Sequence, residues 1–542
     1  MMNPLPIPAP YNEPILSYAP GTPERKSLRI ALDDTSTETK DLPMIIGGEQ
    51  VRTEETFEVR APHRHSLHLG TGYVATRKSV EDAVGAALDA RHAWAELPYE
   101  ERAAIFLRAA DLLAGPWRSR MNAATILGQS KSVFQAEIDS ACELIDMWRW
   151  NVSFANELLR EQPYSPIGSW NRTELRPLEG FILAITPFNF TSIAGNLPTA
   201  PAIMGNTVVW KPSPTQQLSA SLILDLLTAA GLPPGVINMV SGDGAAVSEV
   251  ALPHEYLAGI HFTGSTNTFR HLWKSVAHHL DSYRTYPRLV GETGGKDFIL
   301  AHPSADPKAL TTALLRGAFE FQGQKCSSAS RAYIPKPLWN RIKSDLIEET
   351  ISLPLGDPAN FTTHLGAVID NRAFTRITTA LYEGVGDPHL TLHTGGTWDE
   401  TSGWYIFPTI FETDTPKHPL METELFGPVL TVYTYEETEW DDILTLVDTT
   451  SPYGLTGAVF ATDRAAIAQA SNHLRHAAGN FYINDKPTGA VIGQQPFGGA
   501  RASGTNDKAG SPWNLIRWAS PRSIKETFVP PTDWRYPHLN FE

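Results

Sequence analysis

Cysteine is scarce in this sequence, with two residues among 542. A disulfide framework needs several pairs, and neither cysteine lies in a Cys-x-x-Cys or Cys/His cluster of the kind that binds zinc. A disulfide framework is therefore excluded, and we expect no metal site. Each cysteine has to be interpreted from its own neighbourhood in the chain.

Basic residues and long apolar runs are also in short supply. Lys and Arg number 44 against 59 Asp and Glu, a formal net charge of −15, which argues against nucleic acid or an anionic membrane surface as a partner. No apolar run approaches the length of a membrane span. The first residues carry neither a basic leader region nor an Arg-rich amphipathic pattern, so we expect a soluble, cytoplasmic protein.

The remaining composition is that of a globular protein, with 42% hydrophobic and 10% aromatic residues, and the length indicates roughly two to four domains. Prolines are concentrated in residues 1–45, which predicts an extended arm without regular structure that lies on the main body or on a partner subunit. Helical periodicity follows in 79–115, with Ser79 as the expected N-cap, in 100–114 and in 134–160.

From residue 180 onward, short apolar runs alternate with helical stretches such as 218–230. The expected strands are Phe181–Ile185, Thr207–Trp210, Val236–Val240, Ile260–Phe262, Ala332–Ile334, Val429–Tyr433, Ala458–Ala461 and Phe481–Asn484. This alternation is typical of mostly parallel, doubly wound sheets. We therefore predict two α/β domains that join near residue 290.

Cys326 lies in a small, polar, glycine-containing setting, Phe-Gln-Gly-Gln-Lys-Cys-Ser-Ser. A thiol becomes nucleophilic when it ionises, which exposure, a nearby positive charge or helix N-terminal amides favour. Lys325 and a structured element beginning at this point could supply these conditions. Taken alone, Cys326 is more easily a plain buried thiol. We interpret Cys142, on an amphipathic helix, as an inert core thiol.

Two further side chains are candidates for chemistry. Glu292 stands among glycines in Gly-Glu-Thr-Gly-Gly-Lys, and a glutamate in a protected cleft can have its pKa raised and then activate water. Asn189 follows the strand 181–185, where ligand sites of open α/β sheets lie, and its amide could donate to an oxyanion. Taken singly, an exposed loop glutamate and a turn asparagine are equally good interpretations.

A corner suited to phosphate is predicted at Ile260–Ser265, where a strand runs through a glycine into a helix N-terminus. Lys211, after the strand 207–210, could reach a ribose or phosphate from the same edge. The nearby segment 242–244 is only a fragment of a dinucleotide-binding fingerprint and carries little weight.

Six motifs, in order and spacing, closely resemble the aldehyde dehydrogenase superfamily. They are PFNF at 187–190, FTGS at 262–265, GETGGK at 291–296, GQKCSS at 323–328, ELFGP at 424–428 and QPFGGARASG at 495–504. The resemblance covers the chain from about residue 45 and implies an α/β aldehyde dehydrogenase fold with three parts behind the arm of 1–45. These are a Rossmann-type NAD-binding domain (46–165 and 180–292), an α/β catalytic domain (293–514), and a small oligomerisation flap with its tail (166–179 and 515–542).

The same resemblance implies roles for individual residues. Cys326 is similar to the family nucleophile and Glu292 to its general base, while Asn189 and the backbone N–H of Cys326 resemble the oxyanion hole. The implied cofactor is NAD, on a set of residues that comprises Thr186, Pro187, Lys211, Ser213, Gly264, Ser265, Glu424 and Phe426.

One branch of the superfamily is especially similar, the glutamate γ-semialdehyde (Δ1-pyrroline-5-carboxylate) dehydrogenases. The segments 481–507 and 143–146 and the long arm carry this likeness. It implies NAD-dependent oxidation of L-glutamate γ-semialdehyde to L-glutamate in proline catabolism, and a homodimer. Ala490 stands where the branch often has Ser, and Pro214 where NAD-specific relatives often have an acidic residue. The implied substrate contacts are Glu143, Phe190, Ser327, Gly489, Ala490 and Phe497.

Other functions stay open from the sequence. One is the oxidation of another semialdehyde or of an aliphatic aldehyde, and a second is a non-catalytic binding role on the same fold. A cysteine hydrolase would need a histidine paired with the nucleophile, and none is evident near the motifs. The length leaves no room for an additional flavin domain, which excludes a bifunctional proline-oxidising enzyme.

Overall fold

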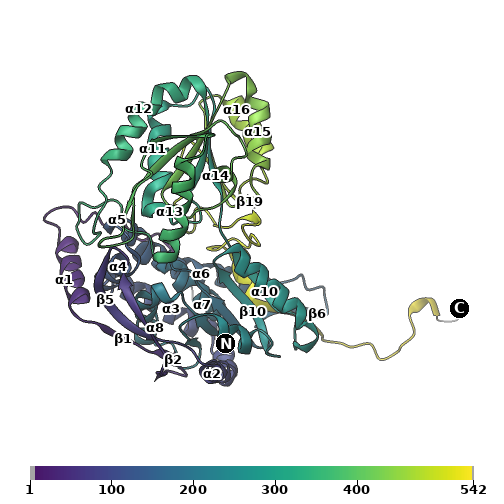
Figure 1. Ribbon diagram of the computed structural model, residues 1–542. Helices are drawn as coiled ribbons and strands as arrows, with labels where there is room; N and C mark the ends of the chain where they lie inside the picture. The colour runs from purple at the N-terminus through teal and green to yellow at the C-terminus, as the bar shows by residue number, and fades with distance from the viewer. Residues whose placement is uncertain (1–6, 540–542) are drawn as a thin grey trace.

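A computed structural model describes residues 7–539 and divides them between two α/β bodies. Figure 1 shows the first body, which carries α3 (Tyr99–Ala114) and α10 (Thr266–His278), below a second body that carries α12 (Lys336–Ser352) and α15 (Trp440–Thr449). Each body is built around a seven-stranded sheet. Residues 1–6 of the expected arm and 540–542 of the expected tail lie outside the described residues.

The first sheet has the strand order β11-β10-β7-β8-β9-β2-β3. Its strands β7 to β11 are parallel, while β2 and β3 form an antiparallel edge. The parallel strands follow the order of doubly wound dinucleotide-binding sheets, in which the ligand crevice opens where the strand order reverses, here between β7 and β10. The bounds are β2 Met44–Ile46, β3 Glu49–Val51, β7 Phe181–Ile185, β8 Thr207–Lys211, β9 Ile237–Met239, β10 Leu257–Thr263 and β11 Arg288–Glu292.

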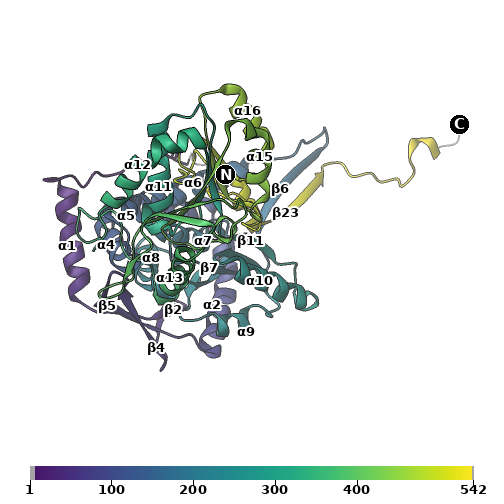
Figure 2. The ribbon, with the colours of Figure 1, turned by 45° about the horizontal axis from the view of Figure 1, so that its top comes forward.

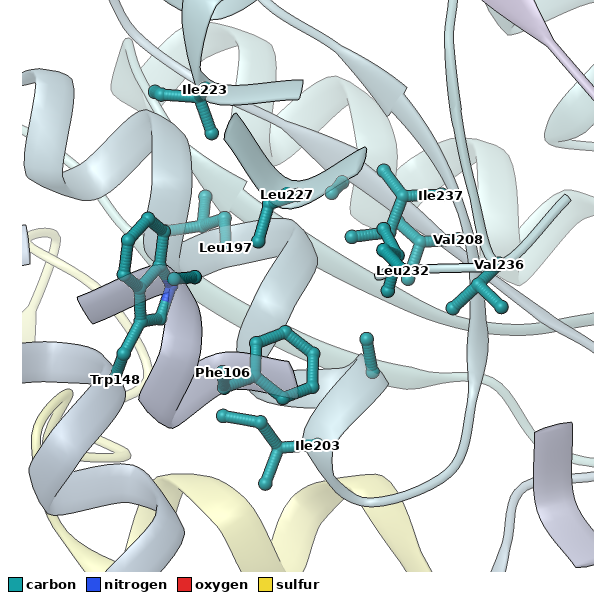
Figure 3. Packing of buried hydrophobic residues seen from close by; sticks show 14 of the residues in the cluster. Phe106, Trp148, Leu197, Ile203, Val208, Ile223, Leu227, Leu232, Val236 and Ile237 are labelled. Atoms are coloured by element: carbon teal, nitrogen blue, oxygen red, sulfur yellow. The ribbon is translucent and has the colours of Figure 1, made fainter. Parts of the chain in front are cut away.

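The central strands of this sheet are apolar at successive positions because helices cover both faces. Ile182 and Val208 point into one core, whereas Phe181 and Val209 point into the other. Figure 3 shows the first core, to which Phe106 of α3, Trp148 of α6 (Leu144–Arg160) and Val208 of β8 belong. The other helices over the two faces are α2 (Arg77–Glu96), α7 (Thr191–Ile203), α8 (Gln217–Ala229) and α9 (Ala245–Ala251).

The second sheet has the order β14-β17-β18-β13-β12-β20-β21, and its strands are parallel except for β14 at one edge. Helices α11 (Pro307–Phe319), α13 (Asn371–Val385) and α16 (Arg464–His473) accompany α12 and α15 in this body. The strand bounds are β12 Asp297–Ala301, β13 Ala329–Pro335, β14 Leu390–Thr394, β17 Thr409–Thr413, β18 Val429–Tyr435, β20 Thr456–Phe460 and β21 Asn480–Ile483.

The N-terminal arm is not irregular throughout, so that prediction is wrong for residues 23–37, 40–42 and 44–45. Helix α1 (Pro23–Thr37) packs Leu28 and Leu32 in a core shared with α4 (Arg118–Gln129). Pro23 occupies the first helical turn, where a proline is tolerated because its missing N–H has no helical partner. Strand β1 (Lys40–Leu42) then pairs with β5 (Arg64–Tyr73), which also pairs with β4 (Thr56–Ala61).

The expected helix 100–114 is confirmed as α3, but two other helical expectations need correction. The N-cap of α2 is Thr76 and not Ser79, and the Thr76 Oγ1 accepts from the N–H of Ser79 at 3.2 Å. The expected helix 134–160 is interrupted by a π-helical segment, Glu137–Glu143, between α5 (Val133–Ala136) and α6. That segment buries three polar side chains, Glu137, Asp139 and Ser140.

A two-stranded ribbon extends away from both bodies. It consists of β6 (Ser169–Pro177) and β23 (Ala519–Thr527), which are antiparallel. Figure 2 shows the two strands side by side, with the C-terminal segment continuing outward beyond them. Among the described residues, no helix is both long enough and apolar enough to cross a lipid bilayer.

Candidate active site

The carboxyl ends of four parallel strands meet at one edge of the first sheet. Thr186 follows β7 and donates its N–H to the carbonyl of Lys211, the last residue of β8, at 3.1 Å. Gly264 follows β10 and donates its N–H to the carbonyl of Glu292, the last residue of β11, at 3.2 Å. The structure therefore joins four predicted site residues through neighbouring strand ends, where such sheets bind ligands.

This edge is suited to an anionic ligand. Ser265 is the N-cap of α10, and its Oγ accepts from the N–H of Thr268 at 3.1 Å, which fixes the first turn of the helix. Burial lowers the pKa of the Lys211 ammonium to about 8, and the charge of Asp243 opposes that effect. Ser213 precedes a short 3₁₀ turn that follows β8. The helix N-terminus and the lysine together favour phosphate or ribose oxygens.

Cys326 lies in a turn that the chain reaches through an unusual backbone path. Three residues in succession have left-handed conformations, Phe321 (φ 52°), Gln322 (φ 54°) and Gly323 (φ 66°). A side chain at Gly323 would come within 2.2 Å of the carbonyl oxygen of Gly427. Gln322 holds the path in place, because its Nε2 donates to the carbonyls of Ser130 and Ala367, each at 2.9 Å. Strained backbone of this kind persists only where the surrounding structure fixes it, often at functional sites.

Glu292 ends β11 and is held by the glycine turn at 498–499. Its Oε2 accepts from the N–H of Gly499 at 3.1 Å, and a Cβ at Gly498 would lie 2.8 Å from its Oε1. Burial raises the pKa of Glu292 well above its ordinary value, while the Gly499 hydrogen bond and the charge of Lys508 act in the opposite direction. A carboxyl group with a raised pKa can accept a proton near neutral pH.

Asn189 is buried on the turn that follows β7 and reaches across to the turn that carries Cys326. Its Nδ2 donates to the carbonyl oxygen of Gln324 at 3.1 Å. The Asn189 amide has a second N–H, which this contact does not use. The side chain is therefore close to the nucleophile candidate, with one donor left for a bound group.

One cavity of about 830 Å³ brings together Cys326, Glu292 and every residue predicted to contact the substrate. Ser327 contacts the residue that precedes Gly489, since the Ser327 Oγ lies 2.8 Å from the Oγ1 of Thr488. Gly489 follows with φ 94°, a conformation that suits glycine. The substrate residues among the lining are Glu143, Phe190, Ser327, Gly489, Ala490 and Phe497.

Residues 50–524 match the aldehyde dehydrogenase family. The chain belongs to that family. This confirms the predicted fold class and the resemblance carried by the six motifs.

Relatives of known structure and curated relatives are similar to this chain over nearly its whole length. A crystal structure of the Δ-pyrroline-5-carboxylate dehydrogenase from Mycobacterium tuberculosis bound with NAD is 56% identical, with a TM-score of 0.97 over 100% of both chains. The mouse mitochondrial Δ1-pyrroline-5-carboxylate dehydrogenase is 50% identical over 97% of this chain and 94% of its own. The Agaricus bisporus Δ1-pyrroline-5-carboxylate dehydrogenase is 48% identical over 98% and 97%.

The cytoplasmic expectation is wrong by these comparisons. The mouse, bovine, human and zebrafish relatives are all named as mitochondrial proteins. The expectation rested on the absence of a recognisable leader pattern in the first residues. The lack of such a pattern is a weak indication of the compartment.

In this aldehyde dehydrogenase, two predicted cofactor residues come from the second body. Glu424 accepts from the N–H of Gly295 at 3.0 Å, and burial raises its pKa to about 7. Phe426 has φ 55° and packs edge-on against Phe188 with ring centroids 5.8 Å apart. Pro187 lies beside Phe188 in the turn after β7. The cofactor set is thus divided between the two sheets.

The surroundings of the thiol differ from the sequence expectation. Lys325 does not activate it, because the Lys325 ammonium donates to Glu320 Oε2 at 2.9 Å, and the next element after Cys326 is β13, not a helix. Burial raises the pKa of Cys326 well above its ordinary value, and the charges of Asp297 and Glu292 add to this effect. The Lys325 ammonium therefore does not favour ionisation of this thiol.

A histidine does line the cavity, although the motifs did not indicate one. This residue is His364, and burial lowers its pKa. Among residues 7–539 no hydrogen bond joins it to Cys326, so a Cys–His pair of the hydrolase type is not formed there. Within the same residues, no three His, Cys, Asp or Glu side chains gather as metal ligands.

Sequence reasoning missed a buried ion pair below the cavity. Lys131 donates to Asp139 at 2.6 Å, and its Nζ lies 4.0 Å from the ring centroid of Phe190. Asp139 also accepts from the N–H groups of Thr191 and Ser192, at 3.0 and 2.9 Å, and so holds the start of α7. No local pattern marks this pair, because Asp139 lies in the π-helical segment, where the helical spacing changes.

Proposed function

We propose that the protein oxidises L-glutamate γ-semialdehyde, the open form of Δ1-pyrroline-5-carboxylate, to L-glutamate with NAD, as the second step of proline catabolism. The observation that carries this proposal is the single cavity shared by Cys326, Glu292 and the six predicted substrate residues. Relatives whose names state this chemistry are similar over nearly the whole chain, which supports the assignment.

The cavity suits a substrate with a carboxylate. Among the described residues, the N–H groups of Gly489 and Ala490 donate no hydrogen bond within the chain, and both residues line the cavity. Backbone N–H groups that converge on one point bind carboxylates without a charged side chain, and the Ser327 hydroxyl would add a third donor. Ala490 supplies no hydroxyl of its own, so recognition there depends on its amide.

The α-ammonium group of the substrate is on the same carbon as the carboxylate and meets a different side chain, Glu143. Burial raises the pKa of Glu143 to about 8, with Asp139 adding to the effect, and an ammonium group bound beside Glu143 would favour its carboxylate form. Phe190 and Phe497 provide apolar walls for the short methylene chain between the α-carbon and the aldehyde. The aldehyde carbon is then directed toward Cys326.

The catalytic roles follow from these positions. The Cys326 thiolate attacks the aldehyde carbon, and the Asn189 amide and the backbone N–H of Cys326 stabilise the resulting oxyanion. Bound NAD supplies the hydride acceptor that turns the thiohemiacetal into a thioester. Glu292 removes a proton from water, the hydroxide attacks the thioester carbonyl, and L-glutamate leaves as the thiol reforms.

Six residues at the edge of the first sheet would hold the adenosine and pyrophosphate parts of the cofactor. They are Lys211, Ser213, Ser265, Thr186, Pro187 and Gly264. Glu424 and Phe426 would contact the nicotinamide ribose from the second body. This division assigns 46–165 and 180–292 to NAD binding and 293–514 to catalysis. The fit rests on the buried Lys211 ammonium and the α10 N-terminus at that edge.

A substrate panel followed by NADH absorbance tests the proposal. We expect kcat/KM for glutamate γ-semialdehyde to exceed that for pentanal by roughly a thousand-fold or more, because the carboxylate donors stay unmatched with pentanal. Proline, which carries the same carboxylate, should compete weakly. Equal efficiency with both aldehydes would reject the proposed substrate and leave the family assignment intact.

We also propose that the protein is a homodimer that forms through the ribbon of β6 and β23 and the segment after it. The segments that flank this ribbon expose large apolar side chains, with Ile167 before β6 105% exposed, and Val529 and Trp534 after β23 83% and 82% exposed. Such a surface and two open strand edges are suited to a second copy. Light scattering should give twice the chain mass for the wild type and the chain mass for V529D/W534D. A monomeric wild type at micromolar concentration would overturn this proposal.

A further inference from the structure

The N-terminal arm contributes to the cavity wall next to the loop that carries the proposed carboxylate donors. We name residues 488–497 the substrate loop. Asn12, Glu13 and Ile15 of the arm line the same cavity as this loop. The arm precedes α1 and lies far from the loop in sequence, so its presence at the cavity is a property of the fold.

Asn12 joins the substrate loop to helix α6 of the first body. Its Nδ2 donates to the carbonyl of Ile492 at 2.7 Å and to Oδ2 of Asp146 at 2.8 Å. Its Oδ1 accepts from Nε2 of Gln494 at 3.1 Å. One side-chain amide therefore makes three hydrogen bonds, two to the loop and one to α6.

Asn12 is itself held rigidly by its neighbour. The N–H of Glu13 donates to Oδ1 of Asp146 at 2.7 Å. The Glu13 carboxylate forms ion pairs with Arg118 and Arg149, and both arginine side chains are only 6% exposed. Buried, paired charges of this kind fix one geometry, because moving either partner leaves a charge unpaired. The arm thus offers Asn12 as a fixed point.

The substrate loop is anchored at both ends, and a fixed contact is needed to hold its middle. At its start, Thr488 is tied to Ser327, and at its end the N–H of Phe497 donates to the carbonyl of Ala509 at 3.0 Å. Between these ends, Gly489 (φ 94°) and Gly493 (φ 80°) have left-handed conformations, and glycine allows the backbone more freedom than other residues. Asn12 binds the loop on both sides of Gly493.

We propose that Asn12 is a positioning residue that holds the substrate loop so that the N–H groups of Gly489 and Ala490 point at the substrate carboxylate. This inference rests on the proposed function, which places the carboxylate at those amides. Asn12 touches neither the aldehyde carbon nor Cys326, so its effect falls on binding of the carboxylate end and not on the chemical steps.

The test compares two aldehydes on the N12L variant, which keeps the branching of the side chain at Cγ and removes its hydrogen bonds. We expect KM for glutamate γ-semialdehyde to rise roughly ten-fold, because the carboxylate donors lose their preset geometry. The kcat at saturation should stay near the wild-type value, and kcat/KM for pentanal should not fall with it. The affinity of the product L-glutamate, measured by calorimetry, should weaken by a similar factor, while NAD affinity is retained.

Q494L provides a second variant that removes one of the two loop contacts, and we expect a smaller rise in KM in the same direction. S17A is the matched control, because Ser17 lies in the same arm and its exposed side chain hydrogen-bonds to Glu24 and Ala19 at the surface. If N12L folds poorly, Q494L and L-glutamate calorimetry still decide the question.

The outcomes separate this inference from the proposed function. An unchanged KM for glutamate γ-semialdehyde in both N12L and Q494L would overturn the positioning role. An equal loss with pentanal would also overturn it, since that pattern indicates general disturbance of the cavity. A wild type without preference for glutamate γ-semialdehyde would reject the proposed function before Asn12 is considered.

Discussion

The two cysteines of this protein provide a direct comparison of a reactive and an inert environment. Both are free thiols, both line the same cavity, and burial raises the pKa of both. The direction of the pKa shift does not distinguish them, although Cys326 is half-buried and Cys142 is buried. A second difference lies in the groups that surround each sulfur.

Those groups differ in kind. The Cys142 sulfur lies in the π-helical segment, 3.5 Å from Arg118 Nη2 and 3.7 Å from both the Pro14 carbonyl and Glu137 Oε1. It is enclosed by the arm and by groups already paired with one another. Cys326 lies on a turn beside Asn189 and Glu292, which have capacity left for a ligand. A nucleophilic cysteine is therefore recognised by neighbouring polar groups that can still bind a ligand.

The largest expected effect contrasts the two thiols. C326S should abolish dehydrogenase turnover, by a factor on the order of 10⁶, because the covalent step is lost, and it should leave NAD binding intact. C142S should retain turnover. NADH absorbance and NAD titration measure both. Substantial turnover in C326S, or loss only in C142S, would invert the assignment.

The next effect concerns release of the acyl group. E292Q should still transfer hydride but hydrolyse the thioester slowly, since an amide cannot accept the proton of the attacking water. We expect a burst of NADH equal to the enzyme concentration, a slow steady phase, and an acyl adduct on Cys326 by mass spectrometry. Unchanged steady-state turnover would mean that another residue is the base.

N189A should have a smaller effect, lowering kcat by roughly a hundred- to a thousand-fold, the usual cost of losing one oxyanion donor. The structure supports this, because the Asn189 amide lies against the turn of Cys326 with one N–H unused. N189D is the control of matched shape. A change confined to KM would show that Asn189 orients substrate and does not stabilise the oxyanion.

A smaller effect is expected in the pH dependence of thioester hydrolysis, the step for which Glu292 is the proposed base. The working form of Glu292 is the carboxylate, and burial raises its pKa well above the ordinary value. As pH falls through that raised pKa, the carboxylate is lost, so the rate of thioester hydrolysis should drop about ten-fold per pH unit. Single-turnover deacylation from about pH 5 to about pH 9 measures this. A rate that stays constant until the ordinary pKa of glutamate would contradict the shift.

The smallest effect is a difference in labelling rate. Iodoacetamide should modify Cys326 faster than Cys142 in the native protein, because the Cys142 sulfur is covered by Pro14 and Glu137. Peptide mapping after short exposures measures both rates. L-Glutamate should protect Cys326 and not Cys142. Faster labelling of Cys142 would show that the arm leaves its sulfur accessible.

The strands of the fold were largely predictable. The expected strand 181–185 matches β7, and 207–210 differs from β8 by one residue, because uninterrupted apolar runs are a strong signal of covered parallel strands. The motifs around Cys326, Glu292 and Asn189 marked a site whose residues the fold does bring together. Here local sequence and tertiary structure agree.

Other features could not be read from local patterns. Helix α1 was hidden by the prolines that precede it, although its buried Leu28 and Leu32 follow helical spacing. The role expected of Lys325 failed, because its pairing with Glu320 depends on how the chain bends at 321–323. The contact of Asn12 with Ile492 spans 480 residues, and no single-sequence pattern reports such a distance.

The left-handed path at 321–323 links the chemistry of this enzyme to its unfolding. Phe321 and Gln322 pay a conformational cost of roughly 1–2 kcal/mol each that only the assembled protein offsets. Gln322 is held by carbonyls of Ser130 and Ala367, which come from different parts of the chain. When either segment loosens, the turn is free to relax and Cys326 moves with it. Denaturant should therefore inactivate the enzyme before its helical signal is lost, through a local opening of the kind seen in native-state exchange.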